Sequence, residues 1–288
     1  MHMVLLLEKC LCSHISVLFN KNKQPKYMTI HEFKDVTLLI TNYNRCKSLE
    51  RLLKAFRDLN CSFEDIVISD DGSQQEQIDY IRSLQSEYPF RLITTPVNKG
   101  LGNNINKGQD SIKTKYTLYI QEDFVPKKEF IVHFSDALQI MQEDNHWDII
   151  SLYAYERYPY IKPYKLGYSE RIFKSAPWYT NNIKFFLYSD HPHLRRSDFL
   201  TKFGRYPEGV NVDKSEMQMS LSFIKNNGKA LVYDDHYGLL TQDNPESEPS
   251  TASFRASWRT KTTFPVLVAK WMYAKYKFIK LNFRLLAK

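Results

Sequence analysis

The chain has 288 residues, enough for one large α/β domain or two smaller ones with a sizeable core. With 43% hydrophobic and 25% charged residues, the composition is that of a globular protein and excludes an intrinsically disordered chain. The net charge of +8 favours anionic partners, such as nucleotide diphosphates, acidic lipid surfaces or nucleic acid. The four cysteines lack zinc-ligand spacing and are too few for a disulfide scaffold, which indicates reduced thiols in a cytosolic protein.

Residues 1–28 are expected to be a leader outside the globular domain. Glu8 and Lys9 interrupt the apolar run at 4–7, and no small-residue cleavage site follows, which argues against a secretory signal peptide. Met28 directly precedes the globular pattern, so the leader is expected to be dispensable for function. The alternative is a weak membrane-contacting segment.

Four short segments rich in β-branched or aromatic residues predict strands, and each is followed by a polar cluster. The segments are 36–41, 66–69, 91–94 and 116–121. Apolar residues between them recur at helical spacing, as at Leu49, Leu52 and Phe56. Strands that alternate with helices predict right-handed βαβ units and a mostly parallel sheet. Because ligands bind at the carboxyl ends of the strands in such sheets, the four polar clusters are expected to form one site.

The polar clusters resemble a known family. In chain order they read Thr-Asn-Tyr-Asn-Arg (41–45), Ser-Asp-Asp-Gly-Ser (69–73), Asn-Lys-Gly-Leu-Gly (98–102) and Gln-Glu-Asp (121–123). In this order and spacing they resemble the family 2 glycosyltransferases of the GT-A fold, most strongly over 35–125. The resemblance implies an α/β protein with a GT-A-like, mostly parallel sheet flanked by helices. It also implies inverting transfer of a sugar from a nucleotide-diphosphate donor to a glycan or lipid-linked acceptor, in the assembly of a bacterial surface polysaccharide.

The resemblance also divides the chain. Residues 29–145 would form a Rossmann-like nucleotide-binding half, and residues 146–241 the acceptor half of the same domain. Residues 242–263 are polar and rich in proline and serine, and are predicted to be a flexible linker or a lid over the bound donor.

The resemblance places the nucleotide in the first three clusters. Thr41 and Tyr43 would hold the base, with the tyrosine ring stacked on it, and the guanidinium of Arg45 offers donors to a phosphate. Asp71 would accept a hydrogen bond from the ribose or from uracil or thymine, which implies a UDP- or dTDP-sugar. Lys99 supplies positive charge toward the pyrophosphate. Each cluster taken alone also fits an ordinary strand-to-helix turn with a serine cap.

The fourth cluster departs from the family pattern. Family members usually carry Asp-x-Asp here, and the last acid holds a divalent cation, whereas this chain has Gln121, Glu122 and Asp123. The resemblance makes Asp123 the ligand of Mn²⁺ or Mg²⁺, with Glu122 as a second possible oxygen donor, because such ions need only one or two carboxylates plus phosphate oxygens. His236 lies where some relatives place a further metal or phosphate contact; the alternative is an ordinary loop histidine.

The candidate general base lies in the acceptor half. The sequence predicts a helix that begins near Ser215 and is ended by Gly228. The family commonly has Glu-Asp at the start of this helix, with the second acid as the base. Glu216 matches that position, and Asp213 is the alternative. Such a carboxylate removes the proton of the acceptor hydroxyl as the new bond forms. The alternative role of Glu216 is to complement the helix dipole.

Acceptor contacts are expected between residues 153 and 196. The aromatic residues of this region, Trp178 among them, fit either an acceptor platform or ordinary core. The polar cluster at 188–196 follows, in which His193 or Arg195 would contact the acceptor or the pyrophosphate. Its two histidines lack a third ligand for a structural zinc.

Residues 264–288 carry an amphipathic helical pattern. Lys270, Lys277, Lys280 and Arg284 fall on one face, and aromatic and aliphatic residues fall on the other. The lysines argue against a transmembrane span, and a basic aromatic helix predicts contact with a membrane surface. We therefore expect a cytoplasmic protein, peripheral on the inner face of the cytoplasmic membrane. The alternative is a helix that packs on the domain.

Two other functions fit parts of the sequence. One is a non-catalytic, membrane-associated nucleotide-binding scaffold of the same fold, which Gln121 favours. The other is a sugar nucleotidyltransferase, which would typically carry a glycine-rich loop with a basic residue after the first strand. No nucleic-acid recognition motif appears, so nucleic acid is not expected as a partner.

Overall fold

A computed structural model of the chain describes residues 29–176, 178–249 and 263–286. All the helices and strands described below belong to one compact unit, His31–Lys288. The predicted leader at 1–28 and the greater part of the predicted loop or lid lie outside the described residues.

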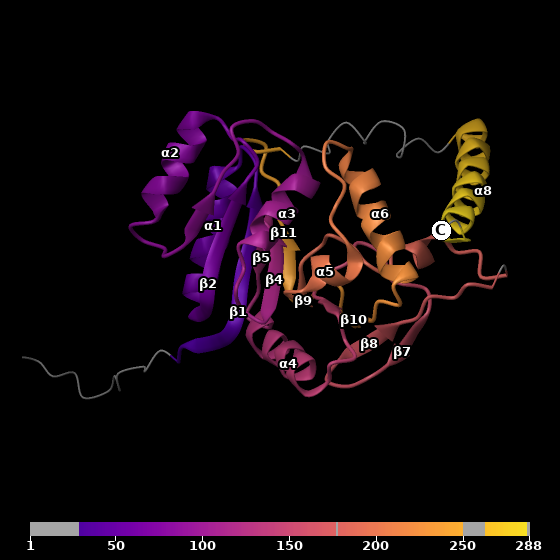
Figure 1. Ribbon diagram of the computed structural model, residues 1–288, viewed down its shortest axis with the longest axis horizontal. Helices are drawn as coiled ribbons and strands as arrows, with labels where there is room; N and C mark the ends of the chain where they lie inside the picture. Colours follow the sequence, from indigo (N-terminus) through magenta and orange to yellow (C-terminus); the bar gives the residue numbers. More distant parts are fainter. Residues whose placement is uncertain (1–28, 177, 250–262, 287–288) are drawn as a thin grey trace, which may run out of the picture. The chain divides into compact units, whose positions relative to one another are not determined.

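Strands and helices alternate along the first half of this unit (Figure 1). Its elements are β1 (His31–Asn42), α1 (Cys46–Asp58), β2 (Cys61–Asp70), α2 (Gln75–Leu84), β3 (Arg91–Ile93), α3 (Leu101–Asp110), β4 (Tyr116–Gln121), β5 (Phe124–Pro126) and α4 (Phe130–Glu143). The second half has shorter strands and ends in a long helix. Its elements are β6 (Ile149–Ser151), β7 (Ile161–Pro163), β8 (Tyr168–Arg171), the 3₁₀ helix η1 (Asn182–Phe185), β9 (His193–Arg196), α5 (Phe199–Phe203), α6 (Val212–Lys225), β10 (Ala230–Tyr233), β11 (Leu240–Gln242) and α8 (Phe264–Leu286).

In the described residues, the main sheet has nine strands in the order β3-β2-β1-β4-β9-β6-β10-β8-β7. The strands β3, β2, β1 and β4 pair in parallel. The pairings of β9 with β4 and β6, and of β8 with β10 and β7, are antiparallel, so these two strands alone run against the direction of the others in the sheet. The predicted, mostly parallel sheet is therefore confirmed. A second, two-stranded sheet joins β5 to β11.

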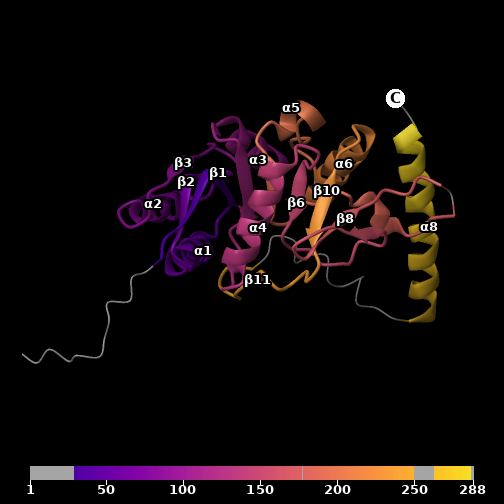
Figure 2. The same cartoon turned by 90° about the horizontal axis from the view of Figure 1, so that it is seen from below.

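Helices cover both faces of the main sheet (Figures 1 and 2). The side chains of Leu38 and Ile40 on β1 belong to one core cluster, with α1 and α4. Leu39 between them belongs to the other cluster, with α3, α5 and α6. Because both faces of β1 are buried, its apolar residues form a continuous run rather than an alternating one.

The four strands predicted in the first half of the domain all exist, and β4 has the predicted boundaries. β1 and β2 begin earlier than predicted, at His31 and Cys61. The strands β5, β7, β8, β9 and β11 were not predicted. Each has only three or four residues, too few to show a period of two, and each forms only because a partner strand lies beside it.

The C-terminal helix α8 forms as predicted, but part of it packs on the domain. Leu281 is buried against Phe185 of η1 and Met217 of α6. The side chain of Asn182 donates a hydrogen bond to the carbonyl of Ala274 (2.9 Å). Lys277 lies on this inner side, contrary to the predicted division of the helix faces, and its ammonium lies 5.2 Å from the ring centre of Phe186.

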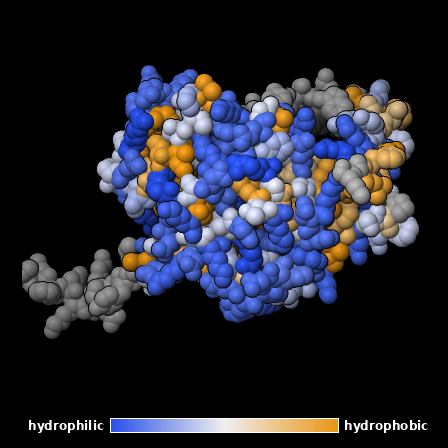
Figure 3. All heavy atoms as spheres, in the orientation of Figure 1, coloured by the Kyte–Doolittle hydropathy of each residue, from blue (hydrophilic) through white to orange (hydrophobic). Residues whose placement is uncertain are grey.

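The outer side of α8 remains apolar and exposed. Trp271 is 63% and Phe283 68% exposed, and further apolar or aromatic residues lie on the same surface: Leu267, Val268, Met272, Tyr276 and Ile279. Figure 3 shows apolar atoms gathered along the edge of the molecule formed by α8. Within the described residues, the length and apolarity of every helix fall short of what crossing a bilayer requires.

Candidate active site

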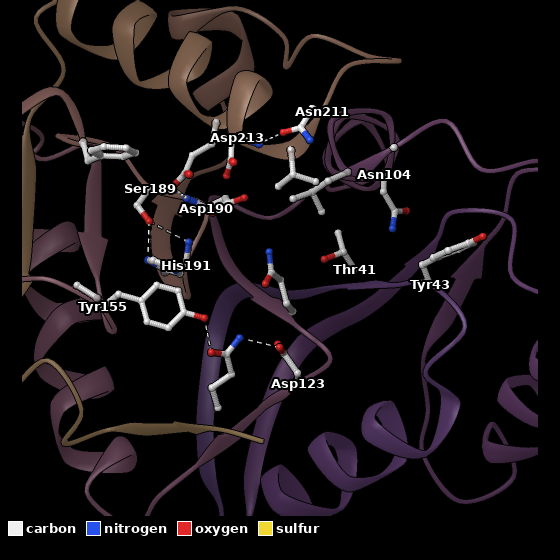
Figure 4. Close-up of a pocket in the computed structure, with 18 of the residues that line it drawn as sticks. Thr41, Tyr43, Asn104, Asp123, Tyr155, Ser189, Asp190, His191, Asn211 and Asp213 are labelled. Atoms are coloured by element: carbon white, nitrogen blue, oxygen red, sulfur yellow. Dashed lines mark hydrogen bonds between the residues drawn. The ribbon is translucent and has the colours of Figure 1, made fainter. Parts of the chain in front are cut away.

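One pocket of about 820 Å³ lies at the carboxyl ends of β1, β2 and β4 and faces the start of α6 (Figure 4). On one side lies the strand-end wall, which we define by its residues: Thr41, Asn42, Tyr43, Arg45, Asp71, Asn104, Glu122 and Asp123. Opposite lies the facing wall, which we define as Arg171, Ser189, Asp190, His191, Asp213, Glu216 and Lys277. The predicted convergence of the strand-end clusters therefore corresponds to a real cavity.

Side-chain hydrogen bonds hold the ends of β1 and β2 together. The side chain of Asn42 donates to a carboxylate oxygen of Asp70 (2.7 Å). Asn104, from α3, donates to the carbonyl of Asn42 (3.1 Å) and accepts from the hydroxyl of Ser69 (2.7 Å). All four residues are buried, so the strand ends are fixed without a ligand.

Asp71 organises the loop before α3. Its carboxylate accepts from the backbone N–H groups of Lys99 (3.1 Å) and Gly100 (2.7 Å). Burial raises the pKa of Asp71, and these two N–H groups offset part of the increase. Gly72 makes the turn possible, since its φ is +75° and a Cβ there would lie 2.5 Å from the carbonyl carbon of Val97.

Glu122 and Asp123 form an acidic pair at the end of β4, with Arg45 across from them. The Nη1 of Arg45 lies 3.0 Å from Glu122 and 3.5 Å from Asp123. Burial, and then the charge of Asp123, raises the pKa of Glu122 to about 8, while Arg45 opposes this shift. In this structure Arg45 therefore forms ion pairs with Glu122 and Asp123. The predicted contact of Arg45 with a phosphate would form in addition to these ion pairs or in their place.

The segment after β11 is tied to the acidic pair and to α1. Gln242 donates to Asp123 Oδ2 (2.7 Å), and the side-chain oxygen of Asn244 accepts from Arg45 (2.8 Å). Glu248 accepts from the N–H and the hydroxyl of Ser48 at 2.7 and 2.6 Å, and so caps α1. Residues 242–248 are therefore anchored, where the sequence suggested a flexible linker or a lid.

The donor set at Asp123 fits a hard divalent cation. Asp123 Oδ1 is buried and has no hydrogen-bond partner in the described part of the chain. A buried carboxylate oxygen without a partner is costly unless it gains a ligand. Mg²⁺ and Mn²⁺ bind through one or two carboxylates plus phosphate oxygens, which matches Asp123 and Glu122. Over the same residues, no cluster of three or more His, Cys, Asp or Glu side chains is placed to hold a metal without such a phosphate.

Glu216 and Asp190 form a second acidic pair on the facing wall, where Figure 4 shows Asp190. Glu216 lies in the second turn of α6, and its Oε1 accepts from the backbone N–H of Asp190 (3.3 Å). Burial, the charge of Glu216 and a hydrogen bond between the two carboxyl groups hold the pKa of Asp190 well above its usual range. The pKa of Glu216 is also raised by burial, but the hydrogen bonds from Asp190 lower it. The two carboxyl groups therefore titrate as a pair that shares a proton.

His191 follows Asp190 in the same loop. Its Nδ1 lies 2.7 Å from the hydroxyl of Ser189. Burial and the nearby charge of Arg171 lower the pKa of His191 to about 4, so this imidazole is neutral at physiological pH. A neutral imidazole offers one hydrogen-bond donor and one acceptor to a sugar hydroxyl.

Five of the predicted site residues do not line the pocket; they are Lys99, Trp178, His193, Arg195 and His236. Lys99 contributes its backbone N–H to Asp71, while its side chain is exposed. Trp178 is 74% exposed and lies outside the pocket, so its acceptor contact stays a prediction. His236 is buried outside the cavity, so a metal contact from it has no support in this structure.

His193 and Arg195 are corrected to core residues. Both lie on β9 with no exposed surface. The guanidinium of Arg195 donates to Gln109 (2.6 Å) and to the hydroxyl of Tyr206 (2.9 Å), which occupies its polar atoms inside the fold. A contact with acceptor or pyrophosphate would require the sheet to open. The sequence cluster looked polar because two buried side chains of a short strand happen to be basic.

Sequence reasoning missed Asp190, His191, Arg171 and Gln242. Asp190 and His191 lie in the polar cluster before β9 that was assigned to His193 and Arg195, so a correct strand assignment would have singled them out. Arg171 ends a four-residue strand, and Gln242 ends a three-residue strand. We find no local sequence signal for either, because their positions depend on pairing with distant strands.

A family model described as glycosyl transferase family 2 matches residues 37–204. Among curated proteins, the poly-beta-1,6-N-acetyl-D-glucosamine synthase of Staphylococcus aureus (strain COL) is 23% identical over 107 residues, 37% of this chain and 26% of that protein. The synthase of Staphylococcus epidermidis is 22% identical over 94 residues, 33% of this chain and 23% of that protein. The chain therefore matches about a quarter of the length of these relatives.

Solved structures with the same fold include two nucleotide-sugar complexes. S. aureus TarS 1-349 in complex with UDP-GlcNAc aligns with a TM-score of 0.53 and 16% identity, over 73% of this chain and 59% of that one. The mannosyltransferase PcManGT of Pyrobaculum calidifontis, in complex with GDP-Man and Mn²⁺, aligns with a TM-score of 0.54 and 12% identity, over 88% of this chain and 72% of that one. The predicted GT-A-like α/β fold is confirmed.

Proposed function

The chain belongs to glycosyl transferase family 2, and on that premise we propose that it transfers a sugar, with inversion, from a nucleotide-diphosphate donor to a hydroxyl of a glycan or lipid-linked acceptor. One observation carries the proposal. A single cavity has a strand-end wall with the acidic pair Glu122 and Asp123, and a facing wall with the carboxylate of Glu216. Inverting transfer needs these two features on opposite sides of the anomeric carbon.

The strand-end wall would bind the nucleotide. The ring of Tyr43 offers a flat surface for a base, and Thr41 lies beside it on the same wall. Asp71 already accepts two N–H groups, and its remaining lone pairs can accept from a ribose or a pyrimidine imide. The UDP complex of TarS and its UDP-GlcNAc complex support a uridine donor, and a deoxythymidine donor presents the same imide.

Asp123, with Glu122, would hold Mn²⁺ or Mg²⁺ against the diphosphate. When bound, such an ion supplies positive charge that stabilises the leaving nucleoside diphosphate. The Mn²⁺ in the PcManGT complex supports this assignment, and so does the unpartnered oxygen of Asp123. Gln121 stands where the family usually has another acid, so the cation would depend more on the phosphate oxygens.

Glu216 would act as the general base. Its carboxylate takes the proton from the acceptor hydroxyl while the hydroxyl oxygen forms a bond to the anomeric carbon. The bond between that carbon and the diphosphate oxygen breaks, and its electron pair leaves with the nucleoside diphosphate. In this proposal Asp190 holds the proton of the pair, because burial and the charge of Glu216 raise the pKa of Asp190. Its hydrogen bond to Glu216 lowers the pKa of Glu216 and favours the ionised form of the base. Asp213, one turn earlier on α6, also lines the pocket and remains the alternative base.

The exposed apolar side of α8 would rest on the inner face of the cytoplasmic membrane and bring the pocket to a lipid-linked acceptor in surface-polysaccharide assembly. Trp271 and Phe283 supply the apolar contact, and the lysines of α8 supply attraction to anionic lipids. Co-sedimentation with vesicles tests this: the double variant Trp271→Ser, Phe283→Ser should bind anionic vesicles more weakly than wild type. Unchanged binding would contradict the membrane role of α8.

The transferase proposal is tested by incubating the full chain with Mn²⁺ and a panel of UDP-, dTDP- and GDP-sugars, and measuring the release of nucleotide. We expect slow hydrolysis of one donor, lost in Asp123→Ala. Glu216→Gln should still bind the donor but should not transfer to an acceptor. Glu246→Gln, an exposed change outside the pocket, is the control. Binding without any turnover in wild type would favour the scaffold function, and no binding at all would contradict both functions.

A further inference from the structure

Arg171 is a buried cation in the pocket with little to satisfy it. It lines the cavity from the end of β8 and is only 5% exposed. Among the residues that the structure describes, its Nε has no hydrogen-bond partner, and its Nη1 makes one long bond, 3.4 Å, to the carbonyl of Leu187. The ring of Tyr158, 5.7 Å from the guanidinium carbon, is its aromatic neighbour. A guanidinium has five donors, so most of its hydrogen-bonding capacity is unused.

The charge of Arg171 is also uncompensated. In the described residues it forms no ion pair, whereas Arg45 on the strand-end wall is paired with Glu122 and Asp123. His191 and His236 are near enough for its charge to lower their pKa, so both histidines are neutral around it. Lys277 brings a second positive charge to the same wall. A buried, unpaired charge costs several kcal/mol, which a fold retains where a ligand supplies the opposite charge.

We propose that Arg171 is the centre of an anion subsite that holds a phosphate or carboxylate group of the acceptor. This inference rests on the proposed function, because it assigns the part of the transferase pocket that the donor does not fill. The guanidinium presents a planar fork that matches either oxyanion with two parallel hydrogen bonds. The acceptor is accordingly an acidic or phosphorylated glycan, or a sugar attached to a lipid through phosphate.

Distance separates this subsite from the donor diphosphate. The acidic pair follows β4, and β8 lies four strands away in the sheet order, roughly 19 Å at about 4.8 Å per strand. This backbone separation favours an acceptor anion over the donor diphosphate as the ligand of Arg171. Glu216 would act between the two subsites: the hydroxyl of the acceptor must reach Glu216 while the anionic group of the acceptor is held at Arg171.

The test compares anionic and neutral sugars as ligands of the full chain, saturated with UDP and Mn²⁺. The probes are glucose 6-phosphate, glucuronate and glucose, with binding followed by calorimetry or ligand-observed NMR. For wild type we expect one of the two anionic probes to bind about tenfold or more tightly than glucose, the size of a charge-assisted hydrogen-bonded pair. The phosphate and carboxylate probes show which oxyanion the subsite takes.

Arg171→Gln should remove the preference, and Arg171→Lys should retain only part of it, because a lysine keeps the charge but not the fork. Lys162→Gln, on the adjacent strand β7 and outside the pocket, makes the same charge change and should keep the full preference. UDP binding should be the same in all four proteins. Thermal unfolding distinguishes a ligand-binding role of Arg171 from a structural one. If Arg171 binds a ligand, Arg171→Gln should unfold at or above the wild-type temperature, because the unpaired buried charge is gone.

Several results would overturn the inference. Equal binding of the three sugars by wild type, or binding of none of them at roughly tens of millimolar, would show that no anion subsite exists. A preference that survives in Arg171→Gln would place the subsite elsewhere.

A marked loss of stability in Arg171→Gln, with weaker UDP binding, would make Arg171 a structural residue. An Arg171-dependent preference for a nucleotide sugar that carries a carboxylate would assign the anion to the donor. If wild type binds no nucleotide or nucleotide sugar, the proposed function itself fails.

Discussion

The strand-end wall and the facing wall of the pocket satisfy their polar groups in different ways. On the strand-end wall, Asn42, Asp71 and Asn104 are bonded to neighbouring backbone or side-chain groups at 2.7–3.1 Å. On the facing wall, burial and the charge of Glu216 raise the pKa of Asp190 well above its usual range, and Arg171 lacks an ion pair within the described residues. Satisfied groups fix a shape, and strained titratable groups supply reactivity or bind charge. Outside the acidic pair Glu122 and Asp123, the strand-end wall is therefore suited to recognition of the donor. The facing wall is suited to the chemistry and to binding a charged group of the acceptor.

The largest effect is expected from Glu216→Gln. The amide cannot accept the proton of the acceptor hydroxyl, so kcat for transfer should fall by about 10²–10⁴-fold. Donor binding should not change, because Glu216 belongs to the facing wall and not to the strand-end wall. Initial rates with a saturating donor, together with a UDP titration, measure both quantities.

Asp213→Asn is the matched comparison for that substitution. A small effect on kcat would leave Glu216 as the base. If Asp213→Asn abolishes transfer while Glu216→Gln is active, the base assignment moves to Asp213.

Asp71→Ala should affect recognition instead of chemistry. It removes the acceptor for the N–H groups of Lys99 and Gly100 and for the nucleotide. We expect UDP affinity to fall about 10–100-fold and the free energy of unfolding to fall by about 1–3 kcal/mol. Glu76→Gln, exposed on α2, is the control. A UDP affinity in Asp71→Ala equal to that of wild type would contradict the assignment of nucleotide recognition to the strand-end wall.

Asp190 should set the pH at which the facing wall works. Its hydrogen bond lowers the pKa of Glu216, so Asp190→Ala should raise that pKa. Because Glu216 must be ionised to act as a base, activity would then be lost at a higher pH as the solution is acidified, and the low-pH limb of the kcat profile should move upward. Asp190→Asn can still donate a hydrogen bond and should leave the limb near its wild-type position. The same limb in all three proteins would show that Asp190 does not act on Glu216.

The smallest effect concerns the anchored segment at 242–248. Glu248→Gln weakens the cap on α1, because the neutral amide accepts less strongly from the N–H and hydroxyl of Ser48. We expect a loss of about 1 kcal/mol in the free energy of unfolding, measured by urea denaturation, and little change in transfer. Glu246→Gln should leave the stability unchanged. A large loss of UDP binding in Glu248→Gln would instead make this segment part of the strand-end wall.

Much of the first half of the domain could be predicted from the sequence. The strands before Asn42, Asp70 and Glu122 are buried apolar runs, and parallel pairing brings their carboxyl ends to one edge. Local pattern and the handedness of βαβ units are enough to predict this arrangement. The sequence alone therefore predicts that the strand-end residues Thr41, Tyr43, Asp71 and Asp123 belong to one site.

The second half was decided by tertiary contacts. The strands β8, β9 and β11 are too short to carry a period, so their pairing with distant strands alone determined that His193 is enclosed and Gln242 meets Asp123. The same pairing buried Arg171 without a carboxylate and brought Asp190 within reach of Glu216. The sequence by itself determined which strand ends form the site, because regular patterns encode regular elements. Burial and pKa depend on every neighbour at once, so only the folded chain decided which charges on the facing wall are available.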